Sequence, residues 1–149
     1  MSPEPLTLKR ILVPIDFSDP ATTALRQAAM LAGATGAEIL LLYIIEPIAY
    51  PAELGVVVNL ESDLEDRAQL ELERLRDRYL SDYSHCQCLV EQGVPDVEIL
   101  EAARRHAVDM IVLGTHGHSG FKHLLLGSTA ERVVRAARCP VLTVHYPDD

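Results

Sequence analysis

The sequence predicts a single α/β domain, built as an open and mainly parallel five-stranded sheet with helices on both faces. Short apolar segments alternate with longer segments in which apolar residues recur at helical spacing, so strands and helices follow one another in turn. Several of the short segments carry almost no polar residues, as strands covered on both faces do. The 149 residues suffice for a sizeable core but leave room for only one domain, residues 1–149.

The first half of the chain predicts two strands and two helices. A short apolar run at residues 10–16 stops at Asp16, as a buried strand does at the edge of a sheet. Ser18 and Pro20 then provide helix-start signals, and this helix should end at the glycines of residues 33–36. Residues 37–45 are too apolar to face water on either side, which predicts a central parallel strand. After a long connection at residues 47–59, an amphipathic helix carries the stripe Leu64, Ala68, Leu72, Leu75 and Tyr79.

The second half continues this alternation. The expected elements are a weaker strand at residues 86–91, a helix opened by Pro95 and carrying Val97, Leu100 and Ala103, a buried strand at residues 110–113 ending at Gly114, a helix at residues 128–138 and a last strand, Val141 to Val144. Ligands of such sheets bind beyond the carboxyl ends of the strands, where the strand order reverses. The search for a site therefore starts at Asp16 and Gly114.

An excess of acidic residues limits the classes of partner. The chain has 13 Lys and Arg against 22 Asp and Glu, a formal net charge of −9 at pH 7 and a pI near 5.0. Nucleic acids and anionic membranes both attract clustered basic residues, so the composition argues against either as a partner. A small anionic ligand is still compatible, because backbone N–H groups at a helix start bind phosphate with almost no side-chain charge.

Cysteine content and the N-terminus predict a cytoplasmic location. Cys86, Cys88 and Cys139 are sparse and odd in number, unlike a secreted disulfide framework. The opening residues MSPEP lack the basic and apolar regions of a signal peptide, and no apolar stretch is long enough to span a bilayer. Cys86-x-Cys88 places two thiols on one face of a strand, which allows a redox pair, but half-buried cysteines without that role are the favoured interpretation. Cys139 is expected in the core.

A glycine-rich segment, residues 114–128, has several features of a phosphate-binding loop. It follows a buried strand and ends at Gly127-Ser128, where a helix begins, and its glycines let backbone amides approach a ligand. The free N–H groups and the positive dipole end of that helix favour an anion, and Lys122 adds a countercharge. Ser128-x-x-Glu131 is also a capping-box pattern, which gives Ser128 a structural role.

The same segment has a plainer interpretation as a flexible connection whose glycines only permit tight geometry. The pattern of residues alone leaves both interpretations open. The segment contains neither the Gly-x-x-x-x-Gly-Lys-Ser/Thr of a Walker A loop nor Gly-x-Gly-x-x-Gly. The fingerprints of the two best-known nucleotide-binding folds are therefore missing from it.

Three blocks of sequence resemble the universal stress protein family. Gly114-x-x-Gly117, nine residues and then Gly127-Ser128 are similar to that family's nucleotide-binding motif, Gly-x-x-Gly-(nine)-Gly-Ser/Thr. The runs ILVPID at residues 11–16, AERVV at residues 130–134 and CPVLTV at residues 139–144 extend the resemblance over nearly the whole chain.

This resemblance implies a stress-response protein of the family's ATP-binding branch, with the adenine nucleotide alpha hydrolase-like fold and the strand order 3-2-1-4-5. The cofactor would be ATP, or ADP or AMP, with Mg²⁺. A homodimer would form through the last strand, Val141 to Val144, because that strand order leaves it as an unpaired edge. Any output would pass through the dimer or an unidentified protein partner.

The resemblance also implies site residues one at a time. Asp16, with Pro14 beside it, would lie close to the base or sugar, and the backbone of Ile44 would meet adenine. Leu113 and Gly114 would line the sugar side. Backbone N–H groups and the Ser128 hydroxyl would hold the phosphates, in a set made up of Gly117, Gly127, Ser128 and Thr129. His116 stands between the first two glycines of the motif and joins the candidate ligand-binding residues.

Three histidines in the glycine-rich segment, His116, His118 and His123, suggest a metal site, since imidazole binds Zn²⁺, Ni²⁺ and Cu²⁺. Spacing on a glycine-rich segment fixes no ligand geometry. No cysteine or carboxylate lies within residues 114–128 to complete a tetrahedral set. Histidines at the surface or at the rim of a phosphate site are therefore favoured, and no metal-ligating residue is assigned.

Two functional hypotheses follow. The first is a regulatory module in which the bound nucleotide alters the segment at residues 47–59 or the dimer surface. The second is a slow ATPase or autophosphorylating phosphotransferase that uses the same pocket, with Asp16 as general base or metal ligand. The sequence places no second acid, arginine finger or activated serine around the γ-phosphate. No catalytic residue is assigned, and fast hydrolysis is not expected.

Overall fold

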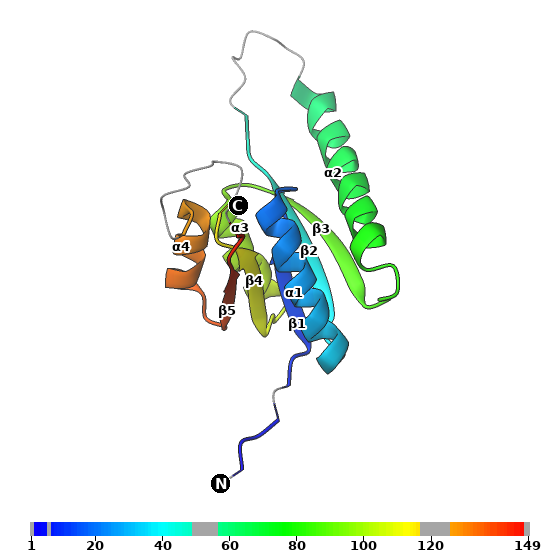
Figure 1. The fold of residues 1–149 in the computed structure, drawn as a ribbon. Helices are drawn as coiled ribbons and strands as arrows, with labels where there is room; N and C mark the ends of the chain where they lie inside the picture. Colours follow the sequence, from blue (N-terminus) through cyan, green and yellow to red (C-terminus); the bar gives the residue numbers. More distant parts are fainter. Residues whose placement is uncertain (1, 6, 49–56, 117–125, 148–149) are drawn as a thin grey trace.

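The computed structural model describes residues 2–5, 7–48, 57–116 and 126–147, which form one sheet flanked by helices (Figure 1). In chain order the elements are β1 (Arg10–Pro14), α1 (Asp19–Thr35), β2 (Glu38–Ile45), α2 (Val57–Tyr79), β3 (Cys86–Gln92), α3 (Pro95–Arg105), β4 (Met110–Gly114), α4 (Ser128–Ala136) and β5 (Val141–Val144). The five strands pair in parallel in the order β3-β2-β1-β4-β5. The fold class and the strand order 3-2-1-4-5 are thereby confirmed.

Two apolar layers cover the two faces of the sheet. Strand residues alternate between the layers, because successive side chains of a strand point to opposite faces. The α1/α2 layer contains Ile11, Val13, Ile39, Leu41 and Val112, together with buried residues of α1 and α2. The α3/α4 layer contains Leu12, Leu40, Leu42, Ile111 and Leu113, together with buried residues of α3 and α4. The central strands are therefore buried on both sides, as their continuous apolar runs predict.

Helix α1 begins and ends at the residues that the sequence marks. Ser18 is its N-cap, and the Ser18 hydroxyl accepts a hydrogen bond from the Ala21 N–H at 3.3 Å. At the other end Gly36 adopts the left-handed conformation, with φ of 76°, and donates its N–H to the Ala32 carbonyl at 2.7 Å. Gly33 lies inside the helix. The buried positions of α1 are alanines except for Leu25, which lets α1 lie close to the strands.

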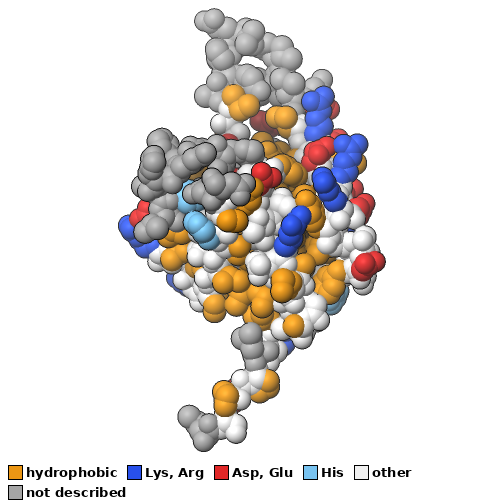
Figure 2. Space-filling view, viewed as in Figure 1, with side chains coloured by type: hydrophobic (Ala, Val, Ile, Leu, Met, Phe, Trp, Pro, Cys, Tyr) orange, Lys and Arg blue, Asp and Glu red, His pale blue; other side chains and the backbone are white. Residues whose placement is uncertain are grey.

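Helix α2 begins earlier than predicted. It starts at Val57, so residues 57–59, expected at the end of a long connection, are helical, while residues 49–56 lie outside the described part of the chain. Its apolar stripe is confirmed, since Ala68 and Leu72 are buried. Charged side chains of both signs cover its outer surface (Figure 2). Among the described residues, no helix has both the length and the apolar character that crossing a bilayer requires.

The buried side of α3 differs from the predicted stripe. Ile99 and Ala102 are buried, whereas Val97 is 49% exposed. At 100° per residue, Val97 lies about 160° around the helix from Ile99, so the two side chains cannot face the same layer. Leu100 and Ala103 lie at the border of the α3/α4 layer. Helix α4 ends at Ala136, two residues before the predicted end.

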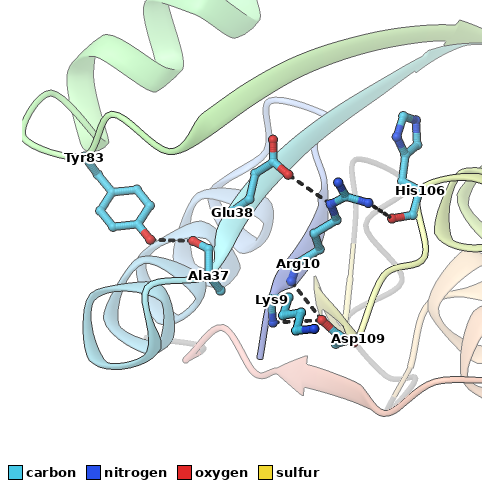
Figure 3. Close-up of polar contacts among 7 residues, drawn as sticks. All are labelled: Lys9, Arg10, Ala37, Glu38, Tyr83, His106 and Asp109. Atoms are coloured by element: carbon cyan, nitrogen blue, oxygen red, sulfur yellow. Dashed lines mark hydrogen bonds and ion pairs between the residues drawn. The ribbon is translucent and has the colours of Figure 1, made fainter. Parts of the chain in front are cut away.

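A polar cluster fastens β1 to β4 at the amino ends of the two strands (Figure 3). One carboxylate oxygen of Asp109 accepts hydrogen bonds from the backbone N–H groups of Lys9 and Arg10, at 2.8 and 2.9 Å. The Arg10 guanidinium donates to the His106 carbonyl at 2.8 Å and forms an ion pair with Glu38 at 3.0 Å. The start of β1 is thus bound to the segment that enters β4 and to the start of β2.

Candidate ligand site at the carboxyl edge of the sheet

Strands β1 and β4 separate at their carboxyl ends. The ladder between β1 and β2 continues to Pro14 and Leu42, but the ladder between β1 and β4 consists of the pairs Ile11 with Met110 and Leu12 with Ile111. The N–H of Ile15 points to β2, where it donates to Leu42 at 2.8 Å. Since N–H groups alternate along a strand, residue 14 would direct its N–H toward β4, and proline has none. Pro14 therefore ends the ladder where the strand order reverses.

Three predicted ligand residues share the face of the sheet that α3 and α4 cover. Leu113 is buried in the α3/α4 layer, and Ile44 packs against the same layer. Pro14 lies on this face too, because it is two residues beyond Leu12. Ile44 follows the β2 residue that pairs with Pro14 by two positions, so β2 extends past the end of β1. The structure brings these three residues to one side of the opening between β1 and β4.

Gly114 has a packing role that the sequence does not reveal. A Cβ atom at this position would lie 2.9 Å from the backbone carbon and oxygen of Pro20, in the first turn of α1. Such distances are too short for any other residue without movement of the backbone. Gly114 is therefore the place where the start of α1 approaches the end of β4.

Asp16 holds the start of α1 in position. One of its carboxylate oxygens accepts hydrogen bonds from the Ser18 N–H, at 3.0 Å, and from the Ser18 hydroxyl. Between them, Phe17 adopts the left-handed conformation, with φ of 62°, which strains a residue other than glycine. The Phe17 ring lies against Tyr43 of β2, with 5.0 Å between centroids. Sequence reasoning missed this turn and its aromatic contact.

Thr115 connects the end of β5 to the start of α4, a role that sequence reasoning also missed. This buried residue donates its N–H to the Val144 carbonyl at 3.1 Å, and its own carbonyl accepts a hydrogen bond from the Gly127 N–H at 2.5 Å. The Thr115 hydroxyl lies 3.1 Å from Nδ1 of His116. In the sequence, the position of Thr115 directly after a buried strand is the signal that could have indicated this role.

Helix α4 presents its N-terminus without a side-chain cap. Gly127 is the N-cap, and no side chain there accepts a hydrogen bond from the first turn. The predicted capping box is therefore wrong: Ser128 is the first helical residue, one position too late to act as the cap. Thr129 follows in the same turn. The first N–H groups of a helix lack intrahelical acceptors, so this end of α4 suits an anion.

The space in front of this turn depends on Gly127 having no side chain. A Cβ atom would lie 3.2 Å from the Thr115 carbonyl oxygen and 3.7 Å from Cα of His116. The backbone of Gly127, with φ of −65° and ψ of 162°, is extended, a conformation open to every residue. Glycine is therefore required at position 127 by the limited space around it and not by its backbone conformation. The other candidates in this loop, Gly117, His118, Lys122 and His123, lie outside the described residues.

Neither a metal cluster of the described residues nor the cavity described below coincides with this edge. The described residues hold no group of three or more His, Cys, Asp or Glu side chains arranged to bind a metal ion. A cavity of about 350 Å³ lies instead at the amino ends of β4 and β5, between the last turns of α3 and α4. Its lining includes Val108, Ile111 and Cys139 but neither Asp16 nor Gly127.

Comparison with known proteins identifies relatives over most of the chain. The model of the universal stress protein family matches residues 7–145. Universal stress protein MJ0531 of Methanocaldococcus jannaschii is 34% identical, over 93% of this chain and 83% of that protein. The solved structure of MJ0577 from the same organism superposes with a TM-score of 0.82 at 28% identity, covering 97% of this chain and 100% of the other.

Two more distant structures share the fold and contain nucleotides. A universal stress protein in complex with cAMP has a TM-score of 0.67 and 21% identity, with 94% of this chain and 98% of that chain covered. The universal stress protein of Archaeoglobus fulgidus in complex with dAMP has a TM-score of 0.65 and 21% identity, with 93% and 98% covered.

Proposed function

The chain belongs to the universal stress protein family, and on that basis we propose that it binds an adenine nucleotide, ATP or its products ADP and AMP, as a regulatory module. We further propose that it acts in the cytoplasm as a homodimer that responds to stress. The nucleotide would lie across the carboxyl edge of β1 and β4, and its occupancy would change the surface offered to a protein partner.

One observation carries this proposal. The uncapped first turn of α4 is held by the hydrogen bond from Gly127 to Thr115, at the place where the β1–β4 ladder has ended. An anion-binding helix start next to a crevice at the reversal of strand order is the arrangement by which open α/β sheets bind nucleotides. It also explains how a chain of net charge −9 accommodates a polyphosphate, since backbone dipoles supply the positive potential.

The proposal assigns residues at this edge to each part of the ligand. Gly127, Ser128 and Thr129 would hold the phosphates through backbone N–H groups and the Ser128 hydroxyl. Ile44 and Leu113, both in or against the α3/α4 layer, would provide the apolar contacts that adenine needs. Asp16, Pro14 and Gly114 would line the sugar side. Gly117 and His116 complete the proposed set, and Mg²⁺ would be held mainly by the phosphates of the nucleotide.

The fold relatives support the choice of adenine. The two nucleotides seen in those structures, cAMP and dAMP, share the adenine base and differ in the sugar and in the phosphate linkage. The shared base supports adenine as the base of the proposed ligand. The choice of a triphosphate as the ligand rests on the resemblance of residues 114–128 to the family motif.

Direct identification of the ligand tests the proposal. Freshly purified protein is denatured, and the released nucleotide is identified by mass spectrometry, with an adenine nucleotide expected. Titration calorimetry then compares ATP binding by Gly127→Val, Gly127→Ala and the unchanged protein. Affinity should fall from the unchanged protein to Gly127→Ala and again to Gly127→Val, because the added atoms would occupy phosphate space near the Thr115 carbonyl.

Gly33→Ala provides a matched control, since an added Cβ meets nothing within 4 Å in the middle of α1. Its ATP affinity should equal that of the unchanged protein. Unchanged ATP affinity in a folded Gly127→Val variant, as judged by circular dichroism, would show that the phosphates do not bind at this turn.

The slow ATPase or phosphotransferase hypothesis uses the same pocket and is tested separately. Asp16 is its only assigned acid, and the carboxylate of Asp16 is engaged with Ser18. Asp16→Asn keeps an oxygen for the Ser18 N–H but removes the base. Phosphate release that saturates with ATP and disappears in Asp16→Asn supports catalysis, whereas retention of intact ATP supports the regulatory module.

A further inference from the structure

Two arginines from different helices lie over one tyrosine ring. Arg26 is in the middle of α1, and Arg78 and Tyr79 are the last two residues of α2. The Cζ atoms of Arg26 and Arg78 are 5.4 and 5.5 Å from the centroid of the Tyr79 ring. The half-buried ring packs against the α1/α2 layer, whereas both arginines are exposed. Two positive charges therefore meet at the surface where α1 and α2 adjoin.

Neither arginine has an acidic partner in the described part of the chain. Most arginines there form an ion pair with a carboxylate, as Arg74 of α2 does with Glu71 at 2.7 Å. Arg26 and Arg78 form no ion pair with any described residue, although the chain has 22 acidic residues against 13 basic ones. Their charge is thus available to a molecule in solution.

The helix dipole accounts for only one of the two arginines. Arg78 lies in the last turn of α2, where a positive charge stabilises the negative end of the helix dipole. Arg26 lies far from either end of α1, and the last turn of α1 holds no basic residue. The dipole acts within the first and last turns, so it does not explain the position of Arg26.

The tyrosine ring orders both guanidinium groups without using their hydrogen-bond donors. A cation over an aromatic ring is attracted by the negative face of the ring, and the N–H groups of arginine lie in the guanidinium plane and stay free to donate. Less rotamer freedom is then lost when a ligand binds. Planar donors of this kind match the two oxygens of a carboxylate, which arginine binds through parallel hydrogen bonds.

We propose that Arg26, Arg78 and Tyr79 form a docking site for a short acidic segment of a protein partner. The segment is a run of Asp and Glu residues that offers one carboxylate to each guanidinium. Two arginines suffice for such a segment, whereas a nucleic acid backbone needs a longer basic surface. The acidic side chains of Glu73 and Asp77 on the same helix would repel an extended polyanion.

This docking site is separate from the proposed nucleotide site. Helix α2 follows the carboxyl end of β2 and leads to the amino end of β3, so Tyr79, its last residue, lies toward the amino edge of the sheet. The proposed nucleotide site lies at the carboxyl edge. Binding of an acidic segment therefore needs no nucleotide and can be measured in its absence.

Fluorescence anisotropy of a fluorescein-labelled hexaglutamate peptide, at low ionic strength and without nucleotide, tests the site. The unchanged protein should bind the peptide saturably. Arg26→Ala and Arg78→Ala should each weaken the affinity about fivefold, as the loss of an exposed ion pair does. Arg138→Ala is the matched control, because it removes the same charge from an exposed arginine on the connection from α4 to β5. Its affinity should equal that of the unchanged protein.

Replacement of the ring separates its support of the arginines from its packing. Tyr79→Phe keeps the ring and should bind the peptide as the unchanged protein does. Tyr79→Leu keeps an apolar side chain against the α1/α2 layer but removes the aromatic face, so its affinity should fall. Circular dichroism checks that each variant is folded, and the two exposed arginine variants provide the test if Tyr79→Leu does not fold.

Three results would overturn the proposal. These are the absence of saturable peptide binding, an equal loss of affinity in Arg138→Ala, and tighter binding of a labelled oligothymidylate with the same number of charges. A failure of ATP binding in calorimetry would instead refute the proposed nucleotide site alone, since the peptide is measured without nucleotide.

Discussion

The Asp16 carboxylate accepts a hydrogen bond from the Ser18 N–H at 3.0 Å, which links the residue after β1 to the N-cap of α1. Ser18 in turn caps the helix through its hydroxyl. A candidate ligand residue therefore also fixes the local backbone. Any experiment that removes Asp16 alters both the site and the helix start.

Replacement of Asp16 should separate these two roles. Asp16→Ala removes the acceptor for both donors of Ser18 and should lower the free energy of unfolding by about 1–2 kcal/mol. Asp16→Asn keeps one acceptor oxygen and should cost less. Urea unfolding measures both, with the exposed Asp63→Ala on α2 as control. Equal stability of Asp16→Ala and the control would contradict a structural role for the Asp16 carboxylate.

Gly114→Ala should destabilise the protein through one close contact. The new methyl group would lie 2.9 Å from backbone atoms of Pro20 and push α1 away from β4. We expect a loss of about 1–3 kcal/mol, as for other overpacked sites. Gly33→Ala, with open space around the new methyl, should instead stabilise α1 by about 0.5–1 kcal/mol. Thermal unfolding followed by circular dichroism compares them; a stable Gly114→Ala protein would refute the contact.

Tyr83 should make stability depend on pH in the alkaline range. Its hydroxyl donates to the carbonyl oxygens of Ala37 and, at 3.3 Å, Ala32 (Figure 3 shows the Ala37 bond). Burial raises the pKa of Tyr83, with a smaller contribution from Cys86. The folded chain therefore holds this proton more tightly than the unfolded chain. The contribution of Tyr83 is complete below the ordinary phenol pKa, about 10, and is lost as the pH rises through the higher folded value.

The matched experiment compares Tyr83→Phe with Tyr146→Phe, which alters an exposed tyrosine. At pH 8 the Tyr83 variant should unfold about 1–2 kcal/mol more easily than the unchanged protein, since the Ala37 carbonyl loses the hydrogen bond from the Tyr83 hydroxyl. That difference should shrink above pH 10. Urea unfolding at several pH values measures it, and a difference that stays constant with pH would rule out this titration.

Leu142→Lys should yield a monomer if the proposed homodimer forms through β5. This strand is at the end of the strand order, and the Leu142 side chain is 38% exposed. A lysine there places a charge against the partner copy, which an edge-to-edge interface does not tolerate. Val97→Lys, at an exposed apolar position of α3, should leave the dimer intact. Light scattering measures the molar mass in solution. A Leu142→Lys protein that still forms the dimer as strongly as the unchanged protein would show that the interface lies elsewhere.

The order of elements could be predicted because the pattern of apolar residues within each segment indicates which of its faces are buried. The run ILLLYII predicts a strand covered on both faces, and β2 confirms this on both layers. Gly36 and Ser18 likewise act on their own helix, so the chain near them specifies the ends of α1. The strand order, in contrast, came from family resemblance, since no local pattern specifies which strands become neighbours.

Several connections of the candidate site could not be predicted from the sequence. Serine is at least as good an N-cap as glycine, so propensity favoured Ser128, whereas the hydrogen bond from Gly127 to Thr115 places the N-cap one residue earlier. Thr115 also meets Val144 across the sheet, a contact between distant parts of the chain. Contacts of this kind depend on the assembled fold, which is why Thr115 and the turn at Phe17 escaped prediction.

The early end of the β1–β4 ladder has a mechanical consequence. The Asp109 carboxylate, just before β4, accepts hydrogen bonds from the backbone at the start of β1 and so joins the amino ends of the two strands. At the carboxyl end of β1, Pro14 has no N–H to donate to β4. The two strands are therefore joined at their amino ends, and no ladder pair joins them beyond Leu12 and Ile111. Because the β1–β4 pairing ends at Leu12 and Ile111, a widening of the gap beyond these residues would break no pairing of the β1–β4 ladder.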